Sequence, residues 1–474
     1  MPRPRHTHWS HIAQALAAQG PTSATALARR IGVSPATLHR YLHDRPDAWV
    51  ATGQAARRRY ALRRDIPGLE PGALPVMRID AHGRLHDAGD LHPISPHGCS
   101  FALAPLGWPV ANDSARGWWE SLPYPILDMR PQGYIGRRFA QALADRLPLP
   151  ANPAQWSDDD SLRVITRYGA DLPGDLIMGE ASIAAWHETQ LRQAPLIEAH
   201  ERPARYALLA EETASSDIPG SSAGGEFPKF TARREPDGSG ATDHVLVKFS
   251  APDEGSATVR RWRDLLLCEH LALEALATVP GVRVAKTQVL DHAGRRFLEV
   301  ERFDRLGAAG RRPVVTLAAI DPELIGLFSH DWRAEAGALA QQGWLDETGQ
   351  QSVCRQWWFG RLIANNDMHP GNLAFQPERL PQARFRPAPA YDMLPAAYAP
   401  LATGEVRTPD FQPPAPAPGE TADWQAAAAA AIPFWRTVAE TQAISDELRT
   451  AAAANAVAIE RIRERLPNVI SPPG

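Results

Sequence analysis

Residues 365–372 read Asn365-Asn366-Asp367-Met368-His369-Pro370-Gly371-Asn372, and Tyr391-Asp392-Met393 follows after a proline-rich stretch. This is a workable order of polar side chains for phosphoryl transfer. One carboxylate can orient an attacking hydroxyl, a later amide oxygen can hold a metal, and a second carboxylate can complete the metal site. Apolar runs at 357–363 and 373–375 flank the loop closely, as in a packed scaffold. The pattern therefore favours a kinase-type catalytic loop over a polar turn between two helices.

The composition of the chain excludes several classes of protein. A length of 474 residues predicts two or three domains, and the net charge of -4 gives no global basic field for nucleic acid. Cys99, Cys268 and Cys354 are widely spaced, which argues against a disulfide framework or a structural zinc site and fits a reducing cytoplasm. The chain shows neither a signal peptide nor an apolar run long enough for a membrane span, so no membrane association is expected.

Residues 1–70 are predicted to form a helix-turn-helix domain, with a basic wing behind it. Residues 23–31 have the apolar spacing of a short helix, and Gly32-Val33-Ser34-Pro35 reads as a tight turn followed by a helix start. The outer face of the second helix would meet a major groove through Thr37, His39 and Arg40. The wing would meet phosphates through an arginine run, namely Arg57, Arg58, Arg59, Arg63 and Arg64.

Two plainer interpretations of this first domain stay open. The helical pair can be a protein–protein module, and an arginine run is often only a solvated face. The histidines at positions 6, 8 and 11 are expected to lie on an unstructured, solvated N-terminus and not in a metal site. DNA binding is favoured because turn chemistry, an apolar inner stripe and local basic charge coincide.

Three further units follow. Residues 71–205 form a mixed α/β unit with a hairpin near 76–85, and no chemistry stands out in it. Residues 206–305 run in the order of a kinase small lobe: a Gly/Ser loop, a strand that ends in Lys248, a helix that contains Glu269, and a strand over 295–303. Residues 306–474 are expected to be mainly helical, with proline-rich excursions at 376–389 and 409–418.

Several of these strings together resemble the HipA family of bacterial serine/threonine kinase toxins. They are residues 220–229, Val247-Lys248, residues 301–305, residues 366–372 and Tyr391-Asp392, and the resemblance covers roughly residues 75–460. The added helix-turn-helix resembles the YjjJ-type branch, in which the DNA-binding element is fused to the kinase instead of belonging to a separate antitoxin. The resemblance implies an α+β fold, in which a winged helix-turn-helix precedes an α/β subdomain and a two-lobed kinase.

The family also implies ATP with Mg²⁺ and roles for individual residues. Lys248 would hold the α- and β-phosphates, Asp367 would orient the hydroxyl, and Asn372 and Asp392 would bind Mg²⁺. The other nucleotide-binding candidates are Ser221, Ser222, Gly224, Gly225, Glu301, Phe303 and His369, with Glu301 and Phe303 beside the adenine at the hinge. Ser221 or Ser222 matches the loop serine that the family phosphorylates on itself. The HRD and DFG motifs of eukaryotic kinases are missing here, so their activation logic does not transfer.

Three functions compete at this stage. The first is a protein kinase that phosphorylates a cellular protein, in a family whose best-known target is an aminoacyl-tRNA synthetase, and that regulates itself through DNA, with a homodimer if the operator is two-fold. The second is a small-molecule kinase with a DNA-binding sensor domain, because residues 367–372 are also close to antibiotic and choline kinases. The third is a transcription regulator that binds nucleotide without turnover. The Gly/Ser loop and residues 301–305 favour the first.

Overall fold

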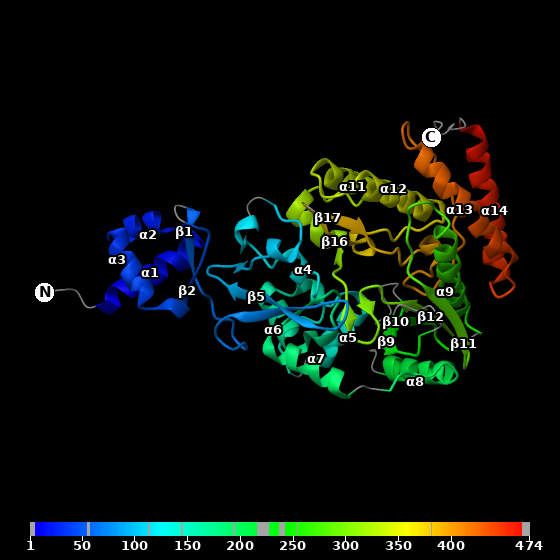
Figure 1. Cartoon of the computed structure of the whole chain (residues 1–474). Coiled ribbons are helices and arrows are strands. Elements are labelled where there is room, and N and C mark those ends of the chain that lie inside the picture. The colour runs from blue at the N-terminus through cyan, green and yellow to red at the C-terminus, as the bar shows by residue number, and fades with distance from the viewer. Residues whose placement is uncertain are drawn as a thin grey trace.

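The computed structural model describes residues 5–54, 57–111, 114–143, 146–192, 195–215, 227–236, 242–253, 255–380 and 382–466. These residues form an N-terminal helical domain, a mixed α/β domain, a strand-rich lobe and a large lobe that is mostly helical. The N-terminal domain lies at one end of the molecule and helices α13 and α14 lie at the other (Figure 1). The predicted α+β architecture, with a helix-turn-helix before a two-lobed body, is confirmed.

The N-terminal domain is a winged helix-turn-helix. Its elements are α1 (Arg5–Gln19), β1 (Thr22–Ser23), α2 (Ala24–Ile31), α3 (Pro35–His43), β2 (Trp49–Thr52) and β3 (Arg59–Leu62). Ser34 starts α3 by accepting a hydrogen bond from the backbone N–H of Thr37, as the sequence predicted. Gly32 ends α2 in the left-handed region at φ 71°, which lets the chain reverse between the two helices. The start of the chain is helical from Arg5 onward, so the expectation of an unstructured N-terminus was wrong there.

The wing is the turn between β2 and β3 in a sheet of order β1-β3-β2. Trp49 fastens this sheet to α3, because its indole N–H donates to the carbonyl of Leu42 at 2.8 Å and its ring packs on Tyr60. The exposed arginines of the wing are Arg57, Arg58 and Arg59. On α3, His39 and Arg40 are exposed, whereas the hydroxyl of Thr37 is hydrogen-bonded to that of Ser34.

Arg63 and Arg64 join the N-terminal domain to the next one and do not lie on the free wing. Arg63 pairs with Ile94 through a β-bridge, and the guanidinium of Arg64 holds both carboxylate oxygens of Asp159 at 2.6 and 2.7 Å. The expected phosphate-facing role of Arg64 was therefore wrong, because a short ion pair already uses its guanidinium.

The second domain is built on a five-stranded antiparallel sheet of order β7-β6-β5-β4-β8. Its strands are β4 (Leu74–Ile79), β5 (Leu85–Pro93), β6 (Cys99–Ser100), β7 (Trp118–Trp119) and β8 (Leu176–Met178). Its helices are α4 (Tyr124–Leu127), α5 (Gly133–Leu143), α6 (Asp158–Tyr168) and α7 (Glu180–Arg192). A capping box between Ser157 and Asp160 starts α6, so the acidic run at 158–160 is the helix start that the sequence predicted.

The small lobe is a four-stranded sheet of order β11-β12-β10-β9 with a helix on each face. Its elements are α8 (Arg202–Ser215), β9 (Lys229–Arg233), β10 (His244–Phe249), α9 (Ala257–Leu276), β11 (Thr287–His292) and β12 (Arg295–Glu301). Side chains alternate along β10, so Val247 packs with Tyr206 of α8 while Lys248 faces α9. The predicted domain boundary at 205/206 falls inside α8, whose apolar face belongs to this lobe.

The large lobe combines helices with a small sheet of order β15-β16-β17. Its elements are β15 (Val315–Thr316), α10 (Leu317–Ile320), α11 (Trp332–Gln341), α12 (Glu347–Leu362), β16 (Ala374–Leu380), β17 (Gln382–Pro387), α13 (Thr421–Glu440) and α14 (Asp446–Arg465). The stretch expected to be a proline-rich excursion at 376–389 is mostly a β-hairpin. Its prolines are tolerated because Pro387 lies on the edge strand and Pro377 lies beyond the short pairing of β16 with β15.

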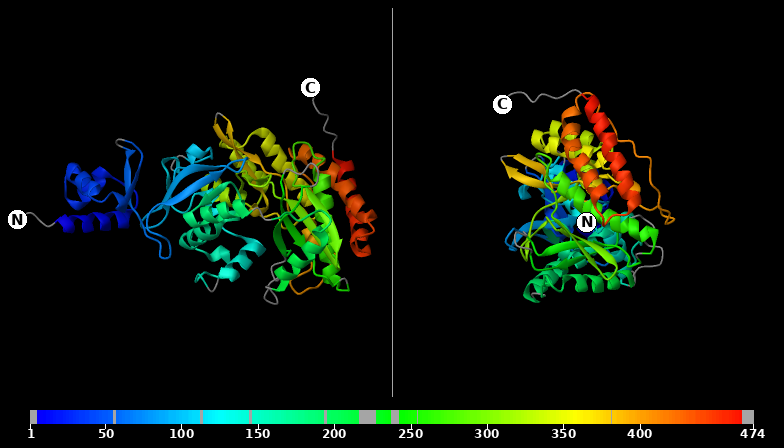
Figure 2. Two further views of the ribbon diagram at one scale, coloured as in Figure 1. Left: turned by 60° about the horizontal axis from the view of Figure 1, so that its bottom comes forward. Right: turned by 90° about the vertical axis from the view of Figure 1, so that its right-hand side faces the viewer.

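The hydrophobic core of the N-terminal domain is separate from the large core of the rest of the molecule. The N-terminal domain has its own cluster around Leu27, Leu38 and Leu42, whereas one continuous core joins the second domain, α9 and the large lobe. The alanine-rich stretch at 426–431 is packed into this large core, inside α13, as predicted. The left view of Figure 2 shows the N-terminal domain projecting from the rest of the molecule. Among the described residues, no helix is long and apolar enough to cross a membrane.

Because the N-terminal domain has its own core, a substitution that creates a cavity there should destabilise only that domain. Leu38→Ala should destabilise that domain by about 2–5 kcal/mol, because Leu38 is fully buried in the small cluster. Hydrogen-exchange mass spectrometry should show reduced protection in α1–α3 and unchanged protection in α12 and α13. The control is Leu191→Ala, at an exposed leucine, which should change stability by about 0.5 kcal/mol or less. An equal decrease of protection in α13 would contradict the separation of the two cores.

Candidate active site

The centre of the candidate site is the ammonium group of Lys248. It lies at the end of β10, is 3 % exposed, and contacts both carboxylate oxygens of Glu269 on α9 at 2.7 and 2.8 Å. The same Nζ also contacts a carboxylate oxygen of Asp392 in the large lobe. One lysine thus joins two small-lobe elements to the large lobe.

Burial and charge act in opposite directions on these three groups. Burial alone would lower the pKa of Lys248, but the carboxylates of Asp392 and Glu269 raise it, so the group is an ammonium ion. Burial would raise the pKa of Asp392, but Lys248 and Lys229 lower it to about 2, and Asp392 is ionised. Burial raises the pKa of Glu269, and the ammonium of Lys248 opposes that effect.

The catalytic-loop candidates form a second group that is tied to the first. Asn365 is buried between them: its side-chain oxygen accepts from the backbone N–H of Asp367 at 3.0 Å, and its side-chain nitrogen donates to the backbone carbonyl of Asp392 at 3.3 Å. Asn372 donates to the backbone carbonyl of Asp367 at 2.8 Å. The hydroxyl of Tyr391 donates to the carbonyl of Gly371 at 2.7 Å. Lys248 thus contacts Asp392 directly, and the backbone of Asp367 is joined to the Asp392 segment through Asn365 and to the side chain of Asn372.

The backbone around these residues is under local strain. Ala364 and Asp392 adopt left-handed φ angles of 58° and 53°, which residues with side chains rarely adopt. Such conformations persist where surrounding contacts impose them, and they concentrate at functional sites. The contacts of Asn365 lie between these two strained positions and supply part of that constraint.

A cavity of about 400 Å³ lies beside this group, at the junction of the lobes. Its walls include Leu246 and Val300 of the small-lobe sheet and the hinge residues Glu301 and Phe303. The ring of Phe303 lies 5.7 Å from the ring of Tyr391, also in the wall. Both hinge candidates therefore border the cavity, although Arg234 already holds the carboxylate of Glu301 at 3.1 Å. A cavity of this size suits a small organic ligand.

The second domain closes one side of the same cavity. Asp128, Arg130 and Ile135 line it, together with the segment that contains Asp171. Asp128 also ties this domain to the large lobe, because its carboxylate accepts from the backbone and the hydroxyl of Thr316 at 2.7 and 2.6 Å. No sequence signal marked residues 71–205 as part of the site, since no motif in them carries chemistry.

Several candidates remain outside what the structure describes or play a different part. Ser221, Ser222, Gly224 and Gly225 lie outside the described residues. The ring nitrogen of His369 accepts from the backbone N–H of Gly371 at 3.1 Å, so it caps the loop turn. Within the described parts of the chain, no three His, Cys, Asp or Glu side chains gather as a metal-binding group. Asn372 and Asp392 nevertheless supply two oxygen donors, which is what Mg²⁺ takes from a protein when phosphates complete its shell.

The outer side of Asp367 opens on a shallow hollow of about 230 Å³. His330, Trp357 and Arg361 line this hollow together with the catalytic loop. Asp367 is itself exposed there. An open hollow of this kind leaves room for a large acceptor to reach the carboxylate.

Comparisons with known proteins show the family of the chain. Residues 221–462 match the HipA-like C-terminal domain, residues 70–187 match the middle domain of YjjJ-like toxins, and residues 3–45 match the helix-turn-helix domain of resolvase. Toxin YjjJ of Escherichia coli (strain K12) is 35% identical over 451 residues, which are 94% of this chain and 97% of that protein. The chain belongs to the YjjJ branch of the HipA-like toxin family. The resemblance seen in the sequence is thereby confirmed.

Two solved structures are more distantly similar to this YjjJ-type chain. A chain of the Shewanella oneidensis MR-1 complex of HipA, HipB and operator DNA matches with a TM-score of 0.46 and 14% identity, over 83% of this chain and 97% of that chain. The Helicobacter pylori proinflammatory kinase CtkA matches with a TM-score of 0.34 and 13% identity, over 50% of this chain and 92% of that chain.

The position of Asn365 between the two groups predicts a loss of function on substitution. Asn365→Ala should lower the rate of phosphoryl transfer by about 10–100-fold, the scale seen when a residue that orients catalytic ligands is removed. The matched control is Asn455→Ala, at another buried asparagine, which lies in α14 and donates to the hydroxyl of Tyr398 at 2.8 Å. Both variants should be less stable, but only the first should be slower at a temperature where both are folded. Equal rates in the two variants would contradict the role of Asn365.

Proposed function

We propose that the chain is an ATP- and Mg²⁺-dependent kinase that phosphorylates serine or threonine hydroxyls of a protein. The observation that carries the proposal is the contact of Lys248 with both Glu269 and Asp392, together with the link from Asp392 through Asn365 to Asp367. Phosphoryl transfer depends mainly on positioning and charge neutralisation, and this set supplies both.

Each residue has a defined task in this proposal. The ammonium of Lys248 would hold the α- and β-phosphates, and the oxygens of Asn372 and Asp392 would face the metal. By holding Mg²⁺, these two residues would place a positive charge beside the phosphate oxygens, which would neutralise the charge that develops on them. Asp367 would orient the acceptor hydroxyl and take its proton, while the hydroxyl oxygen bonds to the γ-phosphorus and the bond to the β-phosphate oxygen breaks.

The exposure of Asp367 favours a protein acceptor over a small molecule. Small substrates are usually enclosed in a pocket that buries most of their surface. Here the carboxylate faces an open hollow lined by His330, Trp357 and Arg361, which a polypeptide segment can enter from solvent. The chain's own Ser221 or Ser222 is a further proposed acceptor.

The catalytic assignment predicts a large effect for one substitution. Asp367→Asn should lower transfer of ³²P from labelled ATP to protein by at least about 10²–10⁴-fold, the scale of a positioned acid–base group. Asp446→Asn, at an exposed aspartate of α14, is the control and should keep the full rate. Near-normal transfer by Asp367→Asn would refute the assignment.

The same assay in cell lysate separates the competing functions. Labelled protein identified by mass spectrometry, including self-labelling, supports the protein kinase. ATP turnover on sugars or aminoglycosides without any phosphoprotein would support a small-molecule kinase. A third outcome is a gel-shift assay in which ATP changes the DNA binding of the chain although no ATP is hydrolysed. That outcome would support a regulator that only binds nucleotide.

The winged helix-turn-helix is proposed to bind DNA, with His39 and Arg40 at the groove and Arg57, Arg58 and Arg59 on the phosphates. Removing one arginine that binds a phosphate should reduce the slope of log affinity against log salt by about 1. Arg57→Ala and Arg58→Ala should therefore each flatten the slope measured on a random-sequence duplex. Arg407→Ala, at an exposed arginine of the large lobe that pairs with Glu405, is the control and should leave the slope unchanged. Unchanged slopes for the wing variants would exclude the wing from the interface.

A further inference from the structure

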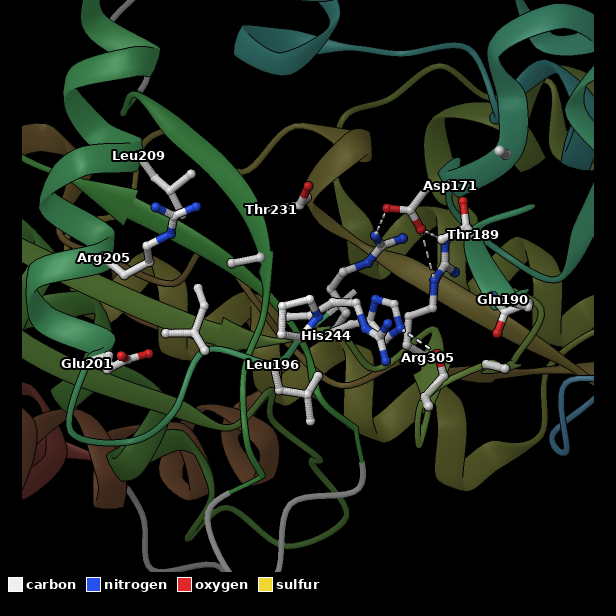
Figure 3. Close-up of a pocket in the computed structure, with 18 of the residues that line it drawn as sticks. Asp171, Thr189, Gln190, Leu196, Glu201, Arg205, Leu209, Thr231, His244 and Arg305 are labelled. Carbon is white, nitrogen blue, oxygen red and sulfur yellow. Dashed lines mark hydrogen bonds and ion pairs between the residues drawn. The ribbon is translucent and has the colours of Figure 1, made fainter. Parts of the chain in front are cut away.

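A second and larger cavity lies behind the lobe hinge. Its volume is about 920 Å³, and its walls come from α7, α8, β9 and the strand pair β13 (Arg305–Leu306) and β14 (Gly310–Arg311) (Figure 3). Lys248, Asp367, Asn372 and Asp392 do not line it. Asp171, Thr231 and Arg302 belong to the walls of this cavity and of the cavity at the hinge, so the two cavities share part of their lining.

Basic side chains line this cavity on more than one side. Its cationic side chains are Arg205, Arg233, Arg302, Arg305 and Arg311, with His200 and His244 beside them. Arg302 and Arg305 are neutralised: they hold Asp171 at 3.0 and 2.7 Å, and both also contact Asp304. Figure 3 shows Asp171 and Arg305 across the cavity from α8, which carries Arg205.

Arg311 forms no ion pair with a carboxylate of the described residues. It is 4 % exposed, one guanidinium nitrogen donates to the carbonyl of Ala170, and Nη1 has no hydrogen-bond partner in the part of the chain that the structure describes. Burial, with the charges of Arg305 and Arg302, lowers the pKa of Arg311 to about 9 against the opposing charge of Asp171. A buried donor left without an acceptor costs about 1–3 kcal/mol, and more when it is charged.

A second arginine of the cavity also has a donor without an acceptor in the described part of the chain. Arg233 binds Asp243 at 2.6 Å through one terminal nitrogen, but its buried Nε also lacks a partner among the described residues. Arg205 is exposed on α8 and brings a further positive charge to the cavity, which Glu201 in the same lining opposes with a negative one. The cavity therefore carries more cationic donors than the described carboxylates around it satisfy.

The cavity also has an apolar surface. Trp186 of α7, Leu208 and Leu209 of α8, and Leu196 and Ile197 between these helices line it. An inorganic ion would leave this apolar surface uncovered. A ligand with an anionic group and an organic part would contact both the basic and the apolar side chains.

We propose that this cavity binds a small organic phosphate of about nucleotide size. Its phosphate oxygens would accept from Arg311, Arg233 and Arg205, since guanidinium groups match phosphate geometry with two parallel donors. Its organic part would lie against Trp186 and Leu209. The site goes beyond the proposed kinase activity and adds a ligand on the far side of the hinge.

The test is isothermal titration of the full chain with inorganic pyrophosphate and with AMP in magnesium-free buffer. The wild-type chain should bind both. Arg205→Glu should weaken both affinities by at least about tenfold, since a charged hydrogen bond contributes about 1.5–3 kcal/mol. Arg205 is exposed, so this variant should fold even if a substitution at buried Arg311 does not.

Two control variants locate the bound anion. Arg407→Glu makes the same charge change on a distant surface arginine and should leave both affinities unchanged. Lys248→Gln removes the lysine that would hold phosphates in the active site, so any binding there should be lost, while the binding that Arg205→Glu weakens should remain. Loss of binding in Lys248→Gln but not in Arg205→Glu would place the anion in the active site and overturn the proposal, as would equal weakening by Arg407→Glu. If the wild-type chain bound pyrophosphate but not AMP, the proposal of an organic ligand would be wrong. If the wild-type chain bound neither, the proposal of an anion site would be wrong.

Discussion

The contact of one buried ammonium with two carboxylates is the interaction on which the catalytic body depends. Lys248 is held by Glu269 from α9 and by Asp392 from the large lobe, so it sets the position of both lobes at the point where they meet. Leaving one charge of such a buried set without its partner is strongly unfavourable. Removal of one member of the set would therefore destabilise the contact between β10, α9 and the Asp392 segment.

The charges of the Lys248 set and of the cavity behind the hinge are unbalanced in opposite directions. When all three groups of the Lys248 set are ionised, they carry one more negative than positive charge, which a divalent cation beside Asp392 would compensate. Behind the hinge, Arg311 adds a positive charge that the Asp171 and Asp304 carboxylates do not match. A cation beside Asp392 and a phosphate beside Arg311 would balance the two charges. Arg302 lines both the cavity at the hinge and the cavity behind it.

Local sequence patterns predicted the elements that depend on neighbouring residues. The turn at Gly32, the cap at Ser34, the strand that ends in Lys248 and the loop from Asp367 to Asn372 all follow from short-range chemistry. What the sequence could not predict depends on contacts between distant segments: the ion pair of Arg64 with Asp159, the hold of Arg234 on Glu301, and the wall that residues 128–135 add to the cavity. Arginines that look equivalent in the sequence can also differ in role. A guanidinium that is paired with a carboxylate from a distant segment is not available to a phosphate.

The junction between the winged helix-turn-helix and the catalytic body is a structured contact and not a tether. A glycine- and serine-rich linker would let the two parts move independently. Here Arg64 grips Asp159 with two short hydrogen bonds, the backbone of Arg63 pairs with Ile94, and Asp159 lies in the first turn of α6, a helix whose buried residues belong to the core of the second domain. That domain in turn closes one side of the cavity at the hinge. The second helix of the motif, α3, is therefore held in a set orientation to the hinge, so a DNA-bound copy would present its catalytic loop in a direction fixed by the fold.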